Sequence, residues 1–78
     1  MQLTYSDGRV IGDVLELRPS KPIGHAPVEF TCEISAGGAA LLGTAPASFY
    51  RATSGDDRFT LTVDRVEGVT LFGTIRRR

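Results

Sequence analysis

The chain has 78 residues, with nine basic and nine acidic side chains and a formal net charge of zero. This length allows one domain with a small core, and a neutral chain has no global field to steer it to nucleic acid or an acidic membrane. The single cysteine cannot form a disulfide within the chain, and no cluster of cysteine and histidine residues predicts a structural metal.

Composition also suggests a source and a location. Eight arginines stand against one lysine, and alanine and glycine are frequent, as in proteins from high-GC bacterial genomes. Residues 1–5 have neither the basic start nor the apolar run of a signal peptide. No apolar stretch approaches the ~20 residues of a membrane span. We therefore expect a cytoplasmic bacterial protein with no membrane partner.

The first element in chain order is a hairpin. The segment Ser6-Asp7-Gly8 predicts a turn between residues 3–5 and a long strand over 9–17. Its register stays open between two pairings, Leu3 with Ile11 across a three-residue loop or Tyr5 with Val10 across a two-residue turn. The apolar alternation of the second strand shifts around Gly12, which predicts a bulge or a bend there.

A proline-rich connection and a regular strand follow. Residues 18–27 hold three of the four prolines, which predicts an extended connection outside the sheet ladder. In residues 28–34, apolar and polar side chains alternate strictly, which predicts an antiparallel strand with one buried face. The apolar set is Val28, Phe30, Cys32 and Ile34.

Residues 35–43 fit two structures. As a hairpin, Gly37-Gly38 forms a two-residue turn that pairs Ile34 with Leu41 and Cys32 with Gly43. As a helix, Ser35 caps its start and Gly43 ends it. We favour the hairpin, because each glycine inside a helix costs about 1 kcal/mol relative to alanine. Residues 45–53 then form a short strand or one helical turn around Pro46, and residues 54–57 form a polar turn.

The final twenty residues predict a second hairpin. Apolar side chains alternate on both sides of Val66-Glu67-Gly68, and a three-residue loop wants a left-handed last residue, which Gly68 supplies. This loop places the apolar side chains on one face. It predicts the pairs Arg65 with Val69, Val63 with Leu71, Leu61 with Gly73 and Phe59 with Ile75.

These elements predict an all-β fold. We expect one β-rich domain over 1–78, a small antiparallel barrel or sandwich of about six or seven short strands with hairpin connections. It includes the proline-rich connection at 18–27 and a basic tail at 76–78. The alternative is an α+β fold with one short helix in 35–53.

The sequence offers little catalytic chemistry. His25 and Cys32 are unique, but Cys32 lies on the apolar side of its strand, which predicts an inert buried thiol rather than a nucleophile. Asp56, Asp57, Asp64 and Glu67 lack the spacing of a calcium loop and fit solvated turns. We therefore expect that the protein is not an enzyme and that it has no catalytic, metal-binding or cofactor-binding residues.

One surface remains as a candidate for binding. Parity places Phe72 on the outward side of the last strand between threonines, and an arginine run follows. The candidate interaction surface is Phe72, Thr70, Thr74, Arg76, Arg77 and Arg78. An exposed aromatic on a flat strand, whose edge is open unless the barrel closes, favours protein contact or self-association. We expect a non-enzymatic binding or assembly module: an oligomeric component, an adaptor or a small inhibitor of the kind mobile elements encode.

The alternative function is a small barrel that binds single-stranded nucleic acid. Phe72, Tyr5 and Tyr50 would stack on bases, and Arg9, Arg51, Arg58 and the terminal arginines would bind phosphates. Overall neutrality disfavours it, because phosphate contacts supply much of the affinity of such complexes.

Overall fold

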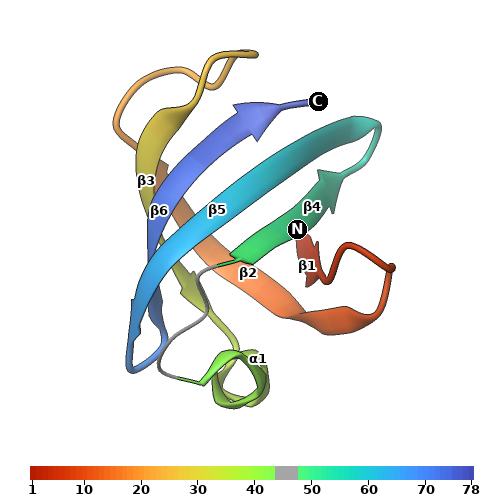
Figure 1. The fold of residues 1–78 in the computed structure, drawn as a ribbon, viewed down its shortest axis with the longest axis vertical. Coiled ribbons are helices and arrows are strands. Elements are labelled where there is room, and N and C mark those ends of the chain that lie inside the picture. Colours follow the sequence, from red (N-terminus) through yellow and green to blue (C-terminus); the bar gives the residue numbers. More distant parts are fainter. Residues whose placement is uncertain (44–47) are drawn as a thin grey trace.

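Six antiparallel strands close into a barrel in the computed structural model, which describes residues 1–43 and 48–78 (Figure 1). The strands are β1 (Gln2–Thr4), β2 (Val10–Pro19), β3 (Val28–Ile34), β4 (Ser48–Ser54), β5 (Asp57–Glu67) and β6 (Thr70–Arg77). One helix, α1 (Ala36–Leu42), lies between β3 and β4 and sits at one end of the barrel. The expected all-β barrel is confirmed, with the short helix of the alternative interpretation added to it.

Barrel closure removes the sheet edge that the sequence suggested. The strand order is β1-β2-β3-β6-β5-β4, and β4 pairs back onto β1 through Leu3 and Ala52. The last strand, β6, pairs with β3 on one side and with β5 on the other. β6 therefore has no open edge, and a partner cannot bind by adding a strand there.

The hydrophobic core lies inside the barrel and is formed by the alternate side chains of each strand that point inward. In β3, Phe30, Cys32 and Ile34 are buried and the residues between them are not, as predicted. Every described strand contributes, and α1 covers the lower opening with two side chains. Among the residues whose burial is described, these apolar residues are buried: Leu3, Ile11, Val14, Phe30, Cys32, Ile34, Ala39, Leu42, Tyr50, Ala52, Phe59, Leu61, Val63, Leu71 and Ile75.

The β5–β6 hairpin has the predicted faces but a different register. Phe59, Leu61, Val63, Leu71 and Ile75 are all buried, and Gly68 has the expected positive φ of 62°. The predicted pairs are wrong: Phe59 lies opposite Arg77, Leu61 opposite Ile75, Val63 opposite Gly73 and Val66 opposite Leu71.

A bulge explains the difference in register. The loop is a two-residue Gly68-Val69 turn, since Glu67 pairs with Thr70. Continued without interruption, this turn would place Val63 opposite Thr74 and divide the apolar residues between the faces. The ladder instead shifts between Val63 and Arg65, so that Asp64 is the extra residue of a β-bulge. The bulge restores the common apolar face that a three-residue loop was expected to provide.

Residues 36–42 form α1, so the favoured hairpin for 35–43 is wrong. As the helical alternative predicted, Gly43 ends the helix, with φ 68°; Ser35 occupies the N-cap position but makes no capping hydrogen bond with its side chain. Tertiary contact offsets the poor local propensity, because Ala39 and Leu42 are buried. Gly38 also allows close packing: a Cβ there would lie 2.9 Å from Ile34 Cδ1 and 3.1 Å from the Ile11 carbonyl oxygen.

Next to its turn, the N-terminal hairpin has the register of the predicted three-residue loop, since Thr4 pairs with Val10 and the Tyr5 N–H donates to the Arg9 carbonyl oxygen. The predicted pair of Leu3 with Ile11 is not formed, because the register shifts beyond Thr4. Leu3 pairs with Gly12 and Thr4 with Val10, so that Ile11 is the extra residue of a bulge. A second irregularity lies at Leu15, between Val14 and Glu16. These two positions bracket Gly12, where the sequence predicted one change of face.

The remaining connections follow the prediction with small changes in their bounds. β2 continues through Pro19, so the proline-rich connection outside the ladder covers residues 20–27. Residues 48–54 form β4, which confirms the strand interpretation for that part of 45–53. Pro46, around which a helical turn was the alternative, lies outside the described residues. Gly55 at φ 61° lies in the predicted polar turn between β4 and β5.

Candidate functional site: the outer face of the sheet

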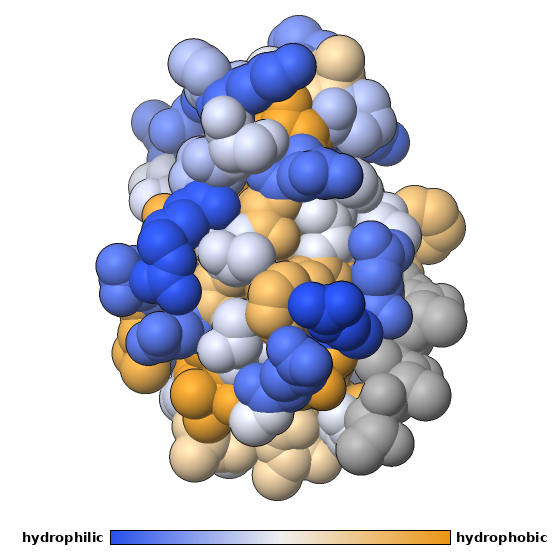
Figure 2. Space-filling view, turned by 90° about the vertical axis from the view of Figure 1, so that its left-hand side faces the viewer, coloured by the Kyte–Doolittle hydropathy of each residue, from blue (hydrophilic) through white to orange (hydrophobic). Residues whose placement is uncertain are grey.

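The outer face of the barrel presents side chains in rows that cross several strands. Figure 2 shows the side formed by β3, β6 and β5, where apolar surface lies between strongly hydrophilic side chains. One row runs from Arg65 on β5 through Phe72 and Thr31 to Arg18 on β2. The predicted outward position of Phe72 is confirmed, and its side chain is partly buried.

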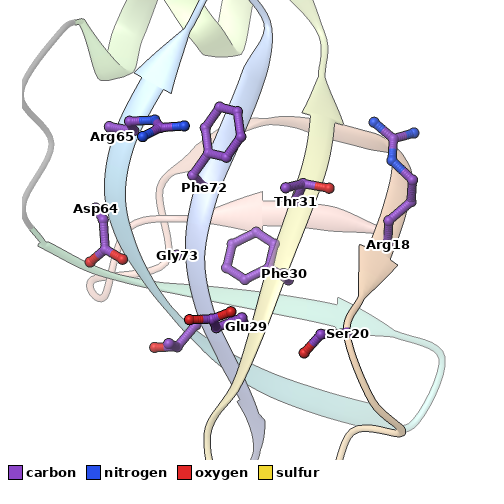
Figure 3. Close-up of a pocket in the computed structure, with 10 residues that line it drawn as sticks. Arg18, Ser20, Glu29, Phe30, Thr31, Asp64, Arg65, Phe72 and Gly73 are labelled. Carbon is purple, nitrogen blue, oxygen red and sulfur yellow. The ribbon is translucent and has the colours of Figure 1, made fainter.

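A shallow pocket of about 370 Å³ lies along this row. The Arg65 guanidinium stacks on the Phe72 ring, 4.1 Å from its centroid, so one aromatic face is covered by a cation (Figure 3). Thr31 on β3 lies opposite Phe72 on β6, and Arg18 on β2 lies opposite Thr31 on the other side of β3. We call this site the Phe72 pocket. Its lining residues are Arg18, Ser20, Glu29, Phe30, Thr31, Asp64, Arg65, Phe72, Gly73 and Thr74.

The Gly68-Val69 turn positions Arg65, and the bulge in β5 positions Asp64. With the register that the sequence predicted, Phe72 would face Thr62; the two-residue Gly68-Val69 turn instead places Arg65 opposite Phe72. The bulge beyond Arg65 leaves Asp64 outside the regular ladder at the border of the pocket. A feature of the backbone therefore creates the arginine–aromatic stack.

Charges of both signs surround the Phe72 pocket. Arg18 is held by two carboxylates, 2.9 Å from Glu16 and 3.5 Å from Glu33. Hydrogen bonding to Glu16 is the largest cause of the raised pKa of Arg18. Within the described residues, Glu29 and Asp64 make no ion pair, so two carboxylates at the pocket remain unpaired.

The structure divides the predicted interaction surface into two parts. Thr70, Phe72, Thr74 and Arg76 all face outward from β6. Arg77 does not join them: its guanidinium forms an ion pair with Asp57 and lies 5.3 Å from the centroid of the Phe59 ring.

Arg78 is not among the residues that line the Phe72 pocket. It is exposed, and its backbone N–H donates to the Arg58 carbonyl oxygen at 2.9 Å. Arg78 thus belongs beside the end of β5 rather than beside Phe72.

Cys32 and His25 lie in different parts of the barrel. Cys32 is fully buried, and burial raises the pKa of its thiol to about 11. The Nδ1 atom of His25 lies 3.2 Å from the Arg77 carbonyl oxygen, to which its Nδ1–H tautomer donates. Cys32 pairs with Leu71, six residues before Arg77, which corresponds to about 20 Å along β6. The two side chains are therefore not a catalytic pair.

The four acidic residues considered for a metal site are also separated. Asp56 and Asp57 lie at the turn between β4 and β5, whereas Asp64 and Glu67 lie near the other end of β5. Within residues 1–43 and 48–78, no group of three or more histidine, cysteine, aspartate or glutamate side chains could hold a metal ion.

Sequence reasoning missed most of the pocket. It identified Phe72 and Thr74, but not Arg65, Arg18 or Glu29. Alternation in β3 already placed Glu29 and Thr31 on the outward side, which was a usable signal. Arg65 was missed because the sequence predicted a three-residue loop that pairs it with Val69, whereas the two-residue turn pairs it with Phe72.

Comparison with known proteins assigns no family to this chain. No family model, no curated protein and no solved structure matches it. Within the part of the chain that the structure describes, no helix has the length and apolar character needed to cross a membrane.

Proposed function

We propose that this chain is a non-enzymatic binding module that acts through contact with a protein at the Phe72 pocket. Its roles would be those expected from the sequence: an oligomeric component, an adaptor or a small inhibitor. The observation that carries the proposal is the Arg65–Phe72 stack inside a pocket bordered by charges of both signs. Aromatic and arginine side chains within a polar rim are typical of the centre of a protein interface.

The unpaired carboxylates define what the partner would present. Glu29 and Asp64 supply acceptors without competing ion pairs among the described residues, and Phe72 supplies apolar surface in the same pocket. A basic or amide-bearing side chain with an apolar stem satisfies both features. At about 370 Å³, the pocket is at the low end of the range for ligand sites and large enough for one such side chain.

Site-specific photo-crosslinking in the organism that encodes the chain tests this proposal. Benzoylphenylalanine would replace Thr31, which lies beside Phe72 on the outer face, and in a matched control it would replace the exposed Ala40 of α1. We expect one dominant protein adduct from position 31 and none from position 40. The mass of the adduct distinguishes a second copy of the chain from another protein.

A second variant ties the adduct to the pocket. Adding Phe72→Ala to the Thr31 cross-linker should remove the adduct, because truncating an interface anchor weakens binding by roughly 1–3 kcal/mol. Equal cross-linking from positions 31 and 40, or an adduct that survives Phe72→Ala, would contradict protein contact at the Phe72 pocket.

A further inference from the structure

The eight arginines divide into two groups according to their ion pairs. Four of them bind a carboxylate: Arg9, Arg18, Arg65 and Arg77. The other four make no ion pair with any residue in 1–43 and 48–78: Arg51, Arg58, Arg76 and Arg78. All four unpaired arginines are exposed.

The unpaired arginines gather on one part of the barrel. Arg51 on β4 lies opposite Thr60 on β5, and Thr60 lies opposite Arg76 on β6. Two strand spacings separate Arg51 from Arg76, which corresponds to about 10 Å between their backbones. The backbone N–H of Arg78 donates to the Arg58 carbonyl oxygen, so these two arginines are also neighbours. We call this group the arginine cluster.

Electrostatic repulsion between Arg78 and the side chains of Arg51 and Arg58 indicates that the arginine cluster is compact. The pKa of Arg78 is lowered, first by partial desolvation and then by the positive charges of Arg51 and Arg58. Like charges held together without counter-charges raise the local potential, and salt screens this potential beyond about 8 Å at physiological ionic strength. The neutral net charge of the chain therefore does not describe this part of its surface.

An exposed aromatic side chain adjoins the arginine cluster. Phe49 on β4 is 68% exposed, a high value for so large an apolar side chain. It lines a second hollow, of about 380 Å³, together with Arg51, Thr60, Arg76 and Arg78. Phe49 is not part of the barrel core, because alternation along β4 directs Tyr50 and Ala52 inward and Phe49 outward.

We propose that the arginine cluster and Phe49 bind single-stranded nucleic acid, at a site separate from the Phe72 pocket. Four unpaired guanidinium groups suit successive phosphates, which they bind through paired N–H donors. Phe49 offers a largely exposed ring on which an unpaired base stacks, and bases inside a duplex are not available for such stacking. This site does not depend on the protein contact proposed above, since it uses different residues.

Salt dependence provides the first test. A fluorescein-labelled oligothymidylate of about 12 nucleotides would be titrated with the whole chain by fluorescence anisotropy, from about 50 to about 200 mM NaCl. Neutralising four phosphates on a single strand predicts a slope of log K against log salt of about −2.8. Arg51→Gln combined with Arg76→Gln should reduce the slope to about −1.4.

A matched control separates this site from general charge. Arg18→Gln removes one positive charge from an arginine that is already paired with Glu16 and Glu33, so it should leave the slope unchanged. Phe49→Ala should lower affinity by roughly five- to a hundred-fold through lost stacking, with no change in slope. Thermal unfolding of each variant would confirm that these exposed substitutions leave the fold intact.

Other ligand classes are outcomes of the same experiment. Equal displacement by a polyglutamate peptide would identify an acidic polypeptide as the ligand and overturn the proposal. Equal affinity for the matching duplex would overturn the stacking role of Phe49. Absence of binding at about 50 mM salt, or an Arg18→Gln effect as large as that of one cluster arginine, would overturn the site itself. None of these outcomes bears on cross-linking at the Phe72 pocket.

Discussion

Gly73 is the position where the smallest change should disturb the barrel most. It lies on β6 opposite Val63, faces the core and is buried, next to the bulge that β5 makes after Val63. A Cβ added there would overlap the Thr62 carbonyl oxygen and lie 2.9 Å from the Thr62 carbonyl carbon and 3.0 Å from Val63 Cα. All three atoms belong to the backbone of β5, so no side-chain rotation relieves the overlap.

The expected loss in Gly73→Ala follows from three contributions. Overpacking costs about 1–3 kcal/mol. Separating β5 from β6 locally weakens at least one ladder hydrogen bond, a further ~0.5–1.5 kcal/mol. Replacing glycine restrains the unfolded chain and returns about 0.4–1 kcal/mol. We expect a net loss of about 2–3 kcal/mol, against a total stability of roughly 4–12 kcal/mol for a domain of this length.

Urea unfolding followed by circular dichroism measures this loss. With a slope of about 1–3 kcal/mol per molar urea, the midpoint of Gly73→Ala should fall by about 1–2 M. Gly24→Ala is the matched control, because a Cβ there meets no atom within 4 Å and the residue has no positive φ. Equal midpoints for the two variants would refute the close approach of β5 and β6 at Gly73.

Three further outcomes are expected. In α1, Gly37→Ala should stabilise the fold by about 0.5–1 kcal/mol, because alanine favours the helix and the added Cβ meets no atom within 4 Å. Gly38→Ala should show no such gain, because its Cβ would lie 2.9 Å from Ile34 Cδ1. Urea midpoints of the two variants measure this difference. Cys32 should react slowly with a thiol reagent at neutral pH. Because its pKa is raised from 9.0 to about 11 on folding, the free energy of unfolding should fall between about pH 9 and 11, and Cys32→Ala should remove that fall. Phe72→Ala should cost the fold only about 1–2 kcal/mol in thermal unfolding, through lost partial burial and the stack with Arg65; complete unfolding would show that Phe72 is core.

The candidate sites could be predicted only in part. Parity along β6 placed Phe72 and Thr74 outward, and the polar side of β3 contained Glu29 and Thr31. Sequence reasoning did not show that Arg65 covers Phe72, because it predicted a three-residue loop, and the two-residue Gly68-Val69 turn sets that contact. It also could not separate paired from unpaired arginines, since Arg77 and Arg76 are neighbours in the chain and yet only Arg77 meets a carboxylate among the described residues.

The amino-acid sequence by itself determined which side chains are buried. Period-two alternation in residues 28–34, 59–63 and 71–75 correctly assigned faces, because a residue's place in an extended chain decides its side of the sheet. Only the tertiary structure decided the register between β5 and β6 and the choice of a helix for residues 36–42. The bulge at Asp64 keeps the apolar face continuous across a two-residue turn, and α1 forms because Gly12 and Gly38 let it lie close against β2. Both choices depend on burial against residues distant in the chain, which local propensity does not contain.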